Sequence, residues 1–92
     1  MMEDTTFKFL VENTDVSYKD VVEATGVSKQ MVSYWSKGIN NIGEKHAVII
    51  ADLMGVPEAY LTVGLDLKGR LQFKKEQLRK ECEKYGFNLE EL

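Results

Sequence analysis

Residues 17–38 of the chain, SYKDVVEATGVSKQMVSYWSKG, decide the fold. Ser17 begins a helical pattern that Gly26 ends, and Ser28 begins a second one that Gly38 ends. Serine is a favoured helix N-cap because its hydroxyl accepts a hydrogen bond from a free backbone N–H, and glycine closes helices in the left-handed conformation. Two short helices joined by a tight glycine turn are typical of the helix-turn-helix motif.

Further details of this stretch support two helices. Asp20 follows Ser17 by three residues, the spacing of a shortened capping box in which side chain and backbone bond reciprocally. Apolar residues at helical spacing predict the inner faces, namely Val21, Val22 and Thr25 in the first helix and Met31, Val32 and Trp35 in the second. The single tryptophan is therefore predicted to be a core residue and not a binding residue.

Helices are also predicted on both sides of the motif. A helix over residues 5–13 would have Asp4 as its N-cap, and a helix over residues 44–54 would follow a polar loop over residues 39–43. Pro57 marks the start of a short fifth helix that ends near residue 61. The inward residues of the two longer helices are predicted to be Phe7, Leu10 and Val11 in the first, and Ala47, Val48, Ile50, Ala51 and Met54 in the second.

The periodicity changes after residue 62. Apolar residues at positions 63, 65 and 67 alternate with smaller or polar ones, Lys68-Gly69 resembles a turn, and alternation resumes at 71 and 73. This alternation predicts a β-hairpin. A helix over residues 74–85 is expected next, followed by a last turn that Asn88 caps.

Composition and charge limit the classes of function. The chain has 92 residues, a net charge of −3, and a single cysteine and a single histidine, Cys82 and His46, which cannot form a zinc site on their own. No apolar run is long enough to span a membrane, and no basic-then-apolar leader is present, so a cytoplasmic location is expected. No cofactor and no enzymatic activity are expected, because no catalytic constellation or phosphate-binding loop is present.

The charge is unevenly distributed. Residues 1–27 carry six acids and two bases, whereas residues 68–84 carry seven bases and three acids. A locally basic surface on an acidic protein is compatible with DNA binding, although it predicts weak non-specific affinity.

Residues 17–61 resemble the phage repressor and Cro family, also called the Xre family. The residues that carry the resemblance are Ser17, Val21, Gly26-Val27-Ser28, Val32, Trp35, Gly38, Ala51, Met54-Gly55-Val56 and Tyr60-Leu61. The resemblance implies a DNA-binding domain over residues 1–62, with residues 63–92 as an extension for dimerisation. The expected fold class is mainly α, a five-helix repressor-like helix-turn-helix domain with a C-terminal β-hairpin and helix.

Members of this family bind DNA as dimers, with the helix after the glycine turn in the major groove. For the recognition helix 28–37, the resemblance implies base reading by Lys29, Gln30, Ser33 and Tyr34. Lysine donates to guanine N7 and O6, and glutamine pairs with adenine through two hydrogen bonds. The alternative is that these residues only form the solvated face of an amphipathic helix.

Contacts to the DNA backbone are expected from residues around the recognition helix, namely Tyr18, Lys19, Lys37, Asn40 and Lys45. The Tyr18 ring could instead pack inward, and each lysine could serve only solubility. The loop over residues 39–43 is not basic, unlike the corresponding loop of many family members, which lowers the expected number of phosphate contacts.

Two apolar sets predict contacts with other chains. The tail residues Leu65, Leu67, Leu71, Phe73 and Leu78 are predicted to form a homodimer surface, because an isolated hairpin needs a cover. The alternative is that the tail packs on the first and fifth helices. Ile39, Ile42 and Ile49 could form a patch for a protein partner, unless the loop folds back over Ile49.

The expected function is a sequence-specific DNA-binding transcriptional regulator that reads an operator as a dimer. The alternative is a protein-interaction module on the same fold, such as an antirepressor, an antitoxin or a DNA mimic. The negative net charge and the acidic first 27 residues favour this alternative.

Overall fold

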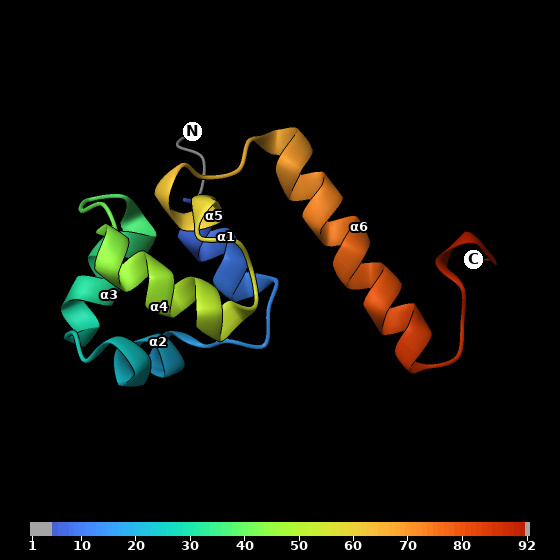
Figure 1. Cartoon of the computed structure of the whole chain (residues 1–92), viewed down its shortest axis with the longest axis horizontal. Coiled ribbons are helices and arrows are strands. Elements are labelled where there is room, and N and C mark those ends of the chain that lie inside the picture. Colours follow the sequence, from blue (N-terminus) through green and yellow to red (C-terminus); the bar gives the residue numbers. More distant parts are fainter. Residues whose placement is uncertain (1–4, 92) are drawn as a thin grey trace.

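The structure is a computed structural model that describes residues 5–91 (Figure 1). Its elements are α1 (Thr6–Glu12), α2 (Tyr18–Thr25), α3 (Lys29–Lys37), α4 (Glu44–Met54), α5 (Ala59–Thr62), α6 (Leu67–Lys84) and the 3-10 turn η1 (Leu89–Glu91). The described residues contain no β-strand. The mainly α class with a helix-turn-helix core is therefore confirmed, and the predicted β-hairpin is wrong.

Local signals define the ends of the motif helices as predicted. The Ser17 hydroxyl accepts a hydrogen bond from the Asp20 N–H at 3.1 Å, and the Asp20 carboxylate accepts one from the Ser17 N–H at 3.0 Å. Gly26 and Gly38 end α2 and α3 with φ of 74° and 75°, in the left-handed region that glycine adopts without strain. The N-cap of α1 is Thr5, and Asp4 lies outside the described residues.

One hydrophobic cluster holds the first four helices together. Its buried residues are Phe7, Val21, Val32, Trp35 and Ile50. Trp35 is 4% exposed, and its ring lies edge-on to Phe7 with centroids 6.1 Å apart, so its core assignment is confirmed. Val48 is 49% exposed, so the prediction that it points inward is wrong. It lies at the edge of the α4 stripe, because Ala47 and Ala51 already occupy the inward positions.

A second cluster joins α6 to the rest of the chain. Phe73 is 8% exposed and packs with Phe9 and Leu10 of α1. Its ring centroid lies 5.9 Å from that of Phe9 and 6.2 Å from that of Tyr60, both in edge-to-face geometry. This aromatic group connects α6 to α1 and α5.

Residues 67–73 form the start of α6 instead of a hairpin, for identifiable reasons. The Asp66 carboxylate accepts a hydrogen bond from the Gly69 N–H at 2.8 Å and so caps the helix. Gly69 falls in the first turn, where a Cβ would meet the Asp66 and Leu65 side chains at 3.2 Å. The residues that follow are mostly Lys, Glu, Gln, Arg and Leu, which are strong helix formers.

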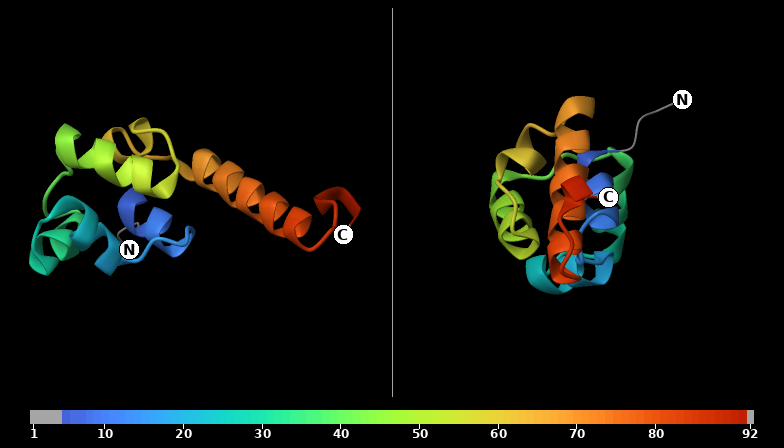
Figure 2. Two further views of the ribbon diagram at one scale, coloured as in Figure 1. Left: turned by 60° about the horizontal axis from the view of Figure 1, so that its bottom comes forward. Right: turned by 90° about the vertical axis from the view of Figure 1, so that its right-hand side faces the viewer.

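The connection between α5 and α6 is fixed by polar contacts to α1. The Leu65 N–H donates to the Thr6 hydroxyl at 3.0 Å, and Arg70 Nε donates to the Leu65 carbonyl at 3.2 Å. The Arg70 guanidinium also lies over the Phe9 ring, 5.3 Å from its centroid. The C-terminal part of α6 extends away from the other helices, as the left view of Figure 2 shows.

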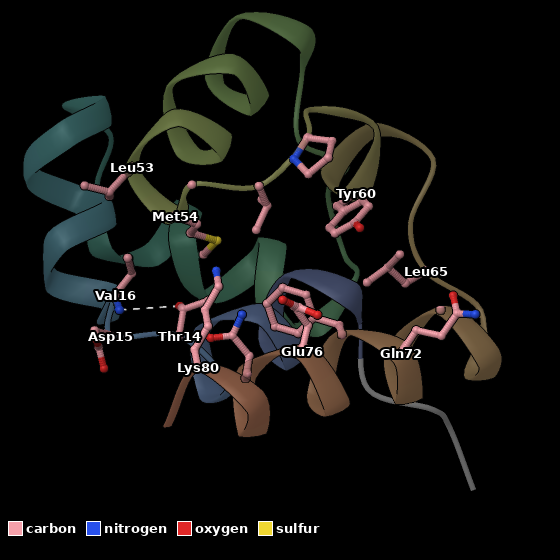
Figure 3. A pocket seen from close by; sticks show the side chains of 16 residues that line it. Thr14, Asp15, Val16, Leu53, Met54, Tyr60, Leu65, Gln72, Glu76 and Lys80 are labelled. Carbon is pink, nitrogen blue, oxygen red and sulfur yellow. Dashed lines mark hydrogen bonds between the residues drawn. The ribbon is translucent and has the colours of Figure 1, made fainter. Parts of the chain in front are cut away.

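A groove of about 650 Å³ separates α6 from the C-terminal end of α4 and the α1–α2 connection (Figure 3). Leu53, Met54 and Val16 line one side, and Gln72, Glu76 and Lys80 of α6 line the other. The face of α6 around Phe73 therefore borders the body of the molecule, while the opposite face of the helix points to solvent.

Candidate nucleic-acid interface

The recognition helix α3 has two faces of different chemistry. Val32 and Trp35 are buried in the first cluster, whereas Lys29 and Gln30 are exposed and Ser33 is half-buried on the other side. The hydroxyl of Ser28 caps the helix by accepting a hydrogen bond from the Met31 N–H at 3.1 Å. The polar residues predicted to read bases thus lie on the surface over the first two turns of the helix.

Gln30 and Tyr34 are joined across one helical turn. The Gln30 side-chain amide, Nε2, donates a hydrogen bond to the Tyr34 hydroxyl at 2.5 Å. Tyr34 is half-buried and Gln30 is exposed. The Tyr34 carbonyl accepts from the Ile39 N–H at 3.0 Å, which closes the helix end around Gly38.

The start of α2 borders the same surface. The Tyr18 ring lies edge-on to Phe7 with centroids 5.8 Å apart, and 37% of Tyr18 stays exposed. Tyr18 therefore packs on Phe7 and also presents part of its surface to solvent. A groove of about 380 Å³ runs between α2 and α3, and its lining residues are Tyr18, Lys19, Val22, Lys29, Val32, Ser33 and Ser36.

The other residues predicted to contact the DNA backbone surround α3. Lys19, Lys37, Asn40 and Lys45 are all exposed, on α2, at the end of α3, in the following loop and in the first turn of α4. The Asn40 amide donates to the Met31 sulfur at 3.5 Å, which ties the loop to α3. Four lysines therefore lie on α3 or on the elements beside it, namely Lys29 and Lys37 on α3, Lys19 on α2 and Lys45 on α4.

The tail residues predicted to form a dimer surface divide into two groups. Leu67, Leu71 and Leu78 are exposed on α6. Phe73 is buried within the chain, and Leu65 is half-buried and packs against the same cluster. Packing of the tail on α1 and α5 thus uses one face of α6 and leaves a leucine stripe on another.

The three isoleucines predicted to form a patch for a protein partner differ in their solvent exposure. Ile39 is 62% exposed, whereas Ile42 and Ile49 are half-buried. Ile42 packs against the first cluster, so only Ile39 is fully available to another molecule.

Tyr85 extends the leucine stripe of α6, and His46 packs on the recognition helix. Tyr85, the C-cap residue of α6, is exposed and follows Leu78 by the same seven residues that separate Leu78 from Leu71. His46 of α4 packs against Trp35 with ring centroids 5.4 Å apart. The sequence signal for Tyr85 is the seven-residue spacing that it shares with Leu71 and Leu78. No local signal indicates the contact of His46 with Trp35, because that contact joins two helices.

The described part of the chain offers neither a metal-binding cluster nor a membrane-spanning helix. Among residues 5–91, no group of three or more His, Cys, Asp or Glu side chains could hold a metal ion. No helix in the same part of the chain is long and apolar enough to cross a membrane.

Comparison with known proteins identifies the family. The helix-turn-helix family model matches residues 10–61, which is more than half of the chain and extends from α1 through most of α5. A search of curated proteins and a search of solved structures found no significant match. The matched segment contains both motif helices, their glycine turn and the exposed face of α3. The chain therefore belongs to the helix-turn-helix family of the Xre/Cro type, a family of DNA-binding regulators.

Proposed function

We propose that this protein is a sequence-specific transcriptional regulator that reads an operator as a dimer through α3. The observation that carries this proposal is the outer face of α3, where Lys29 and Gln30 are exposed and Ser33 is half-buried. In helix-turn-helix proteins the N-terminal residues of this helix meet base edges in the major groove. Such a role would place the protein in the cytoplasm, together with the DNA.

The side chains on this face have complementary chemistry for bases. Lys29 is a donor suited to guanine N7 and O6, and Gln30 offers a donor and an acceptor suited to adenine. Ser33, one turn after Lys29, can donate or accept. Tyr34 lies beside Gln30 and completes the set of four base-reading candidates.

The surrounding residues would hold the DNA backbone. Lys19, Lys37 and Lys45 are exposed near α3, and Tyr18 and Asn40 add a hydroxyl and an amide. Each phosphate that a lysine neutralises contributes roughly −0.9 to the slope of log affinity against log salt. The three lysines Lys19, Lys37 and Lys45 therefore predict a slope of about −3 for each protomer.

The exposed leucine stripe of α6 is our candidate dimer surface. Leu71 and Leu78 point roughly 150° away from Phe73 around the helix, at 100° per residue. Leu71 is 58% exposed, and the stripe ends at Tyr85. Because α3 and the C-terminal part of α6 lie at opposite ends of the molecule (Figure 1), pairing through α6 would leave the reading face free.

Surface substitutions test this dimer better than a deletion. Removing residues 63–92 would also uncover Phe9, which Phe73 covers. We expect Leu71→Ala combined with Leu78→Ala to shift the sedimentation coefficient from dimer to monomer while the circular dichroism spectrum stays unchanged. Val63→Ala is the matched control, since Val63 is exposed but lies outside the stripe. A double variant that still sediments as a dimer would place the interface elsewhere.

Selection of DNA followed by substitution tests the reading face. A duplex pool is enriched with the wild-type protein, and affinities for the selected sequence and its single-base variants are measured by fluorescence anisotropy. Gln30→Ala should relax preference at one or two positions and cost about 1–3 kcal/mol. Gln72→Ala, at an exposed glutamine of α6 away from α3, is the control. An unchanged base preference in Gln30→Ala would remove Gln30 from the reading face.

A protein-interaction module is the second candidate, and one observation favours it. Val48 and Leu53 of α4 are exposed, as is Ile39, so apolar surface is available near the motif. Binding through such residues would depend little on salt, whereas phosphate binding weakens steeply as salt rises. Failure of the wild-type protein to enrich any duplex at low salt would favour this candidate.

A further inference from the structure

We propose that Tyr34 is a positioning residue that makes Gln30 select adenine over guanine. This inference rests on the proposed function, because it concerns how one side chain of the reading face chooses its base. It starts from the hydrogen bond that Gln30 Nε2 donates to the Tyr34 hydroxyl at 2.5 Å. The two residues are four apart on α3, the spacing at which side chains of a helix meet.

The contact restricts a side chain that would otherwise be mobile. Gln30 is exposed, and an exposed glutamine samples many rotamers. Fixing such a side chain in one rotamer when DNA binds costs conformational entropy. Tyr34 is the more rigid partner, because it is half-buried and its backbone carbonyl is held by the Ile39 N–H. The tyrosine hydroxyl therefore prepares Gln30 before it meets a base.

The same bond fixes which hydrogen-bonding groups Gln30 presents. A glutamine amide has two N–H donors and one carbonyl acceptor. One N–H is used by Tyr34, so one N–H and the carbonyl oxygen remain for a base edge. Adenine presents N7 as an acceptor and the N6 amino group as a donor, which matches this pair.

Guanine requires a different arrangement. Its major-groove edge presents two acceptors, N7 and O6. A glutamine whose two N–H groups are both free can donate to both acceptors. A glutamine held by Tyr34 would instead bring its carbonyl oxygen toward a second oxygen, which is repulsive. Tyr34 thus converts a tolerant side chain into one that discriminates between the two purines.

A first experiment measures the contact without DNA. Nitrogen-15 relaxation of the side-chain amides reports their motion on the picosecond to nanosecond timescale. We expect the Gln30 amide to be more ordered than the amide of exposed Gln72 in the wild-type protein, and to lose this order in Tyr34→Phe. A Gln30 amide that is equally mobile in both proteins would overturn the positioning role, whatever the protein binds.

A second experiment measures base preference. The wild-type protein is expected to prefer adenine over guanine by at least about tenfold at the position that Gln30→Ala relaxes. Tyr34→Phe, which keeps the ring and removes only the hydroxyl, should reduce that ratio several-fold while the other positions of the site keep their preferences. Tyr60→Phe, on α5 and outside both the reading face and the leucine stripe, is the control and should leave the ratio unchanged.

The outcomes separate the two proposals. A wild-type preference for guanine at this position, or an unchanged ratio in Tyr34→Phe, would overturn the inference and leave the proposed function intact. Failure of the wild-type protein to select any duplex would overturn the proposed function, and with it adenine selection by Gln30. The amide relaxation data would then still decide whether Tyr34 orders Gln30.

Discussion

Phe73 joins α6 to the body of the protein, and Phe73→Ala should therefore destabilise the whole fold. The side chain is 8% exposed, so it loses nearly all of its contact with water on folding. Burial of a phenylalanine contributes about 1.5–3 kcal/mol, and an edge-to-face aromatic pair adds about 0.5–1.5 kcal/mol. Phe73 makes two such pairs, with Phe9 and Tyr60. We expect a loss of about 4 kcal/mol, within the range measured for large-to-small substitutions in protein cores.

Denaturant unfolding followed by circular dichroism measures this loss directly. Gln72→Ala, at the exposed neighbouring position of α6, should change the unfolding free energy by less than about 0.5 kcal/mol. A Phe73→Ala protein as stable as Gln72→Ala would contradict the reasoning, because it would mean that α6 does not pack on α1 and α5.

Two further predictions concern the ends of the motif helices. The backbone and hydroxyl of Ser17 and the charge of Lys19 hold the pKa of the Asp20 carboxyl below its ordinary value. The ionised Asp20 carboxylate therefore stabilises the fold at pH values above the ordinary pKa of an aspartate. This contribution is lost as the pH falls through the lowered pKa of Asp20. The difference in unfolding free energy between wild type and Asp20→Asn should thus shrink below about pH 4, and a difference independent of pH would contradict this. Gly38→Ala should cost about 1–2 kcal/mol in thermal or denaturant unfolding, because φ is 75° and the new Cβ would meet Thr5 Cγ2 at 3.2 Å. Gly43→Ala, with φ of −68° and open space around it, brings no such strain and should cost less, about 0.5 kcal/mol for the poorer N-cap of α4, and equal effects of the two substitutions would refute the argument from backbone strain.

The motif helices were predictable from the sequence because their ends are encoded locally. Ser17 and Asp20 bond to each other within one turn, and Gly26 and Gly38 take the left-handed conformation that few other residues adopt. The burial of Trp35 followed from its three-residue spacing after Val32. Such signals depend on neighbours in sequence, so they need no knowledge of the tertiary structure.

The tail was predicted incorrectly because a short apolar alternation has two interpretations. Positions 63, 65, 67, 71 and 73 all fit the two-residue period of a hairpin, while Leu67 and Leu71, four residues apart, also fit one turn of a helix. The cap at Asp66 decides in favour of the helix. Burial of Phe73 depends on Phe9, which is far away in sequence, and no local pattern indicates that contact.

The reading face was predictable as a set of positions but not as a geometry. The resemblance assigned base reading to four residues of α3, and the structure places their side chains at the surface or half-buried beside it. That Gln30 bonds to Tyr34 could have been inferred from their four-residue spacing, yet the choice of partner depends on rotamers that a sequence does not show. Leu71 and Phe73 illustrate the same limit, since they share one helix but lie on different faces.

The salt dependence of binding to a selected duplex tests the central claim, that α3 and its surrounding lysines bind DNA. A dimer with about six lysine–phosphate contacts should lose roughly 10³-fold in affinity between about 50 and 200 mM salt. Lys37→Ala should make the slope less steep by about one unit for each protomer, whereas Lys75→Ala, on α6, should leave it unchanged. A steep slope that Lys37→Ala reduces is the result that our account predicts. A flat salt dependence, or no binding at the lowest salt, would contradict it.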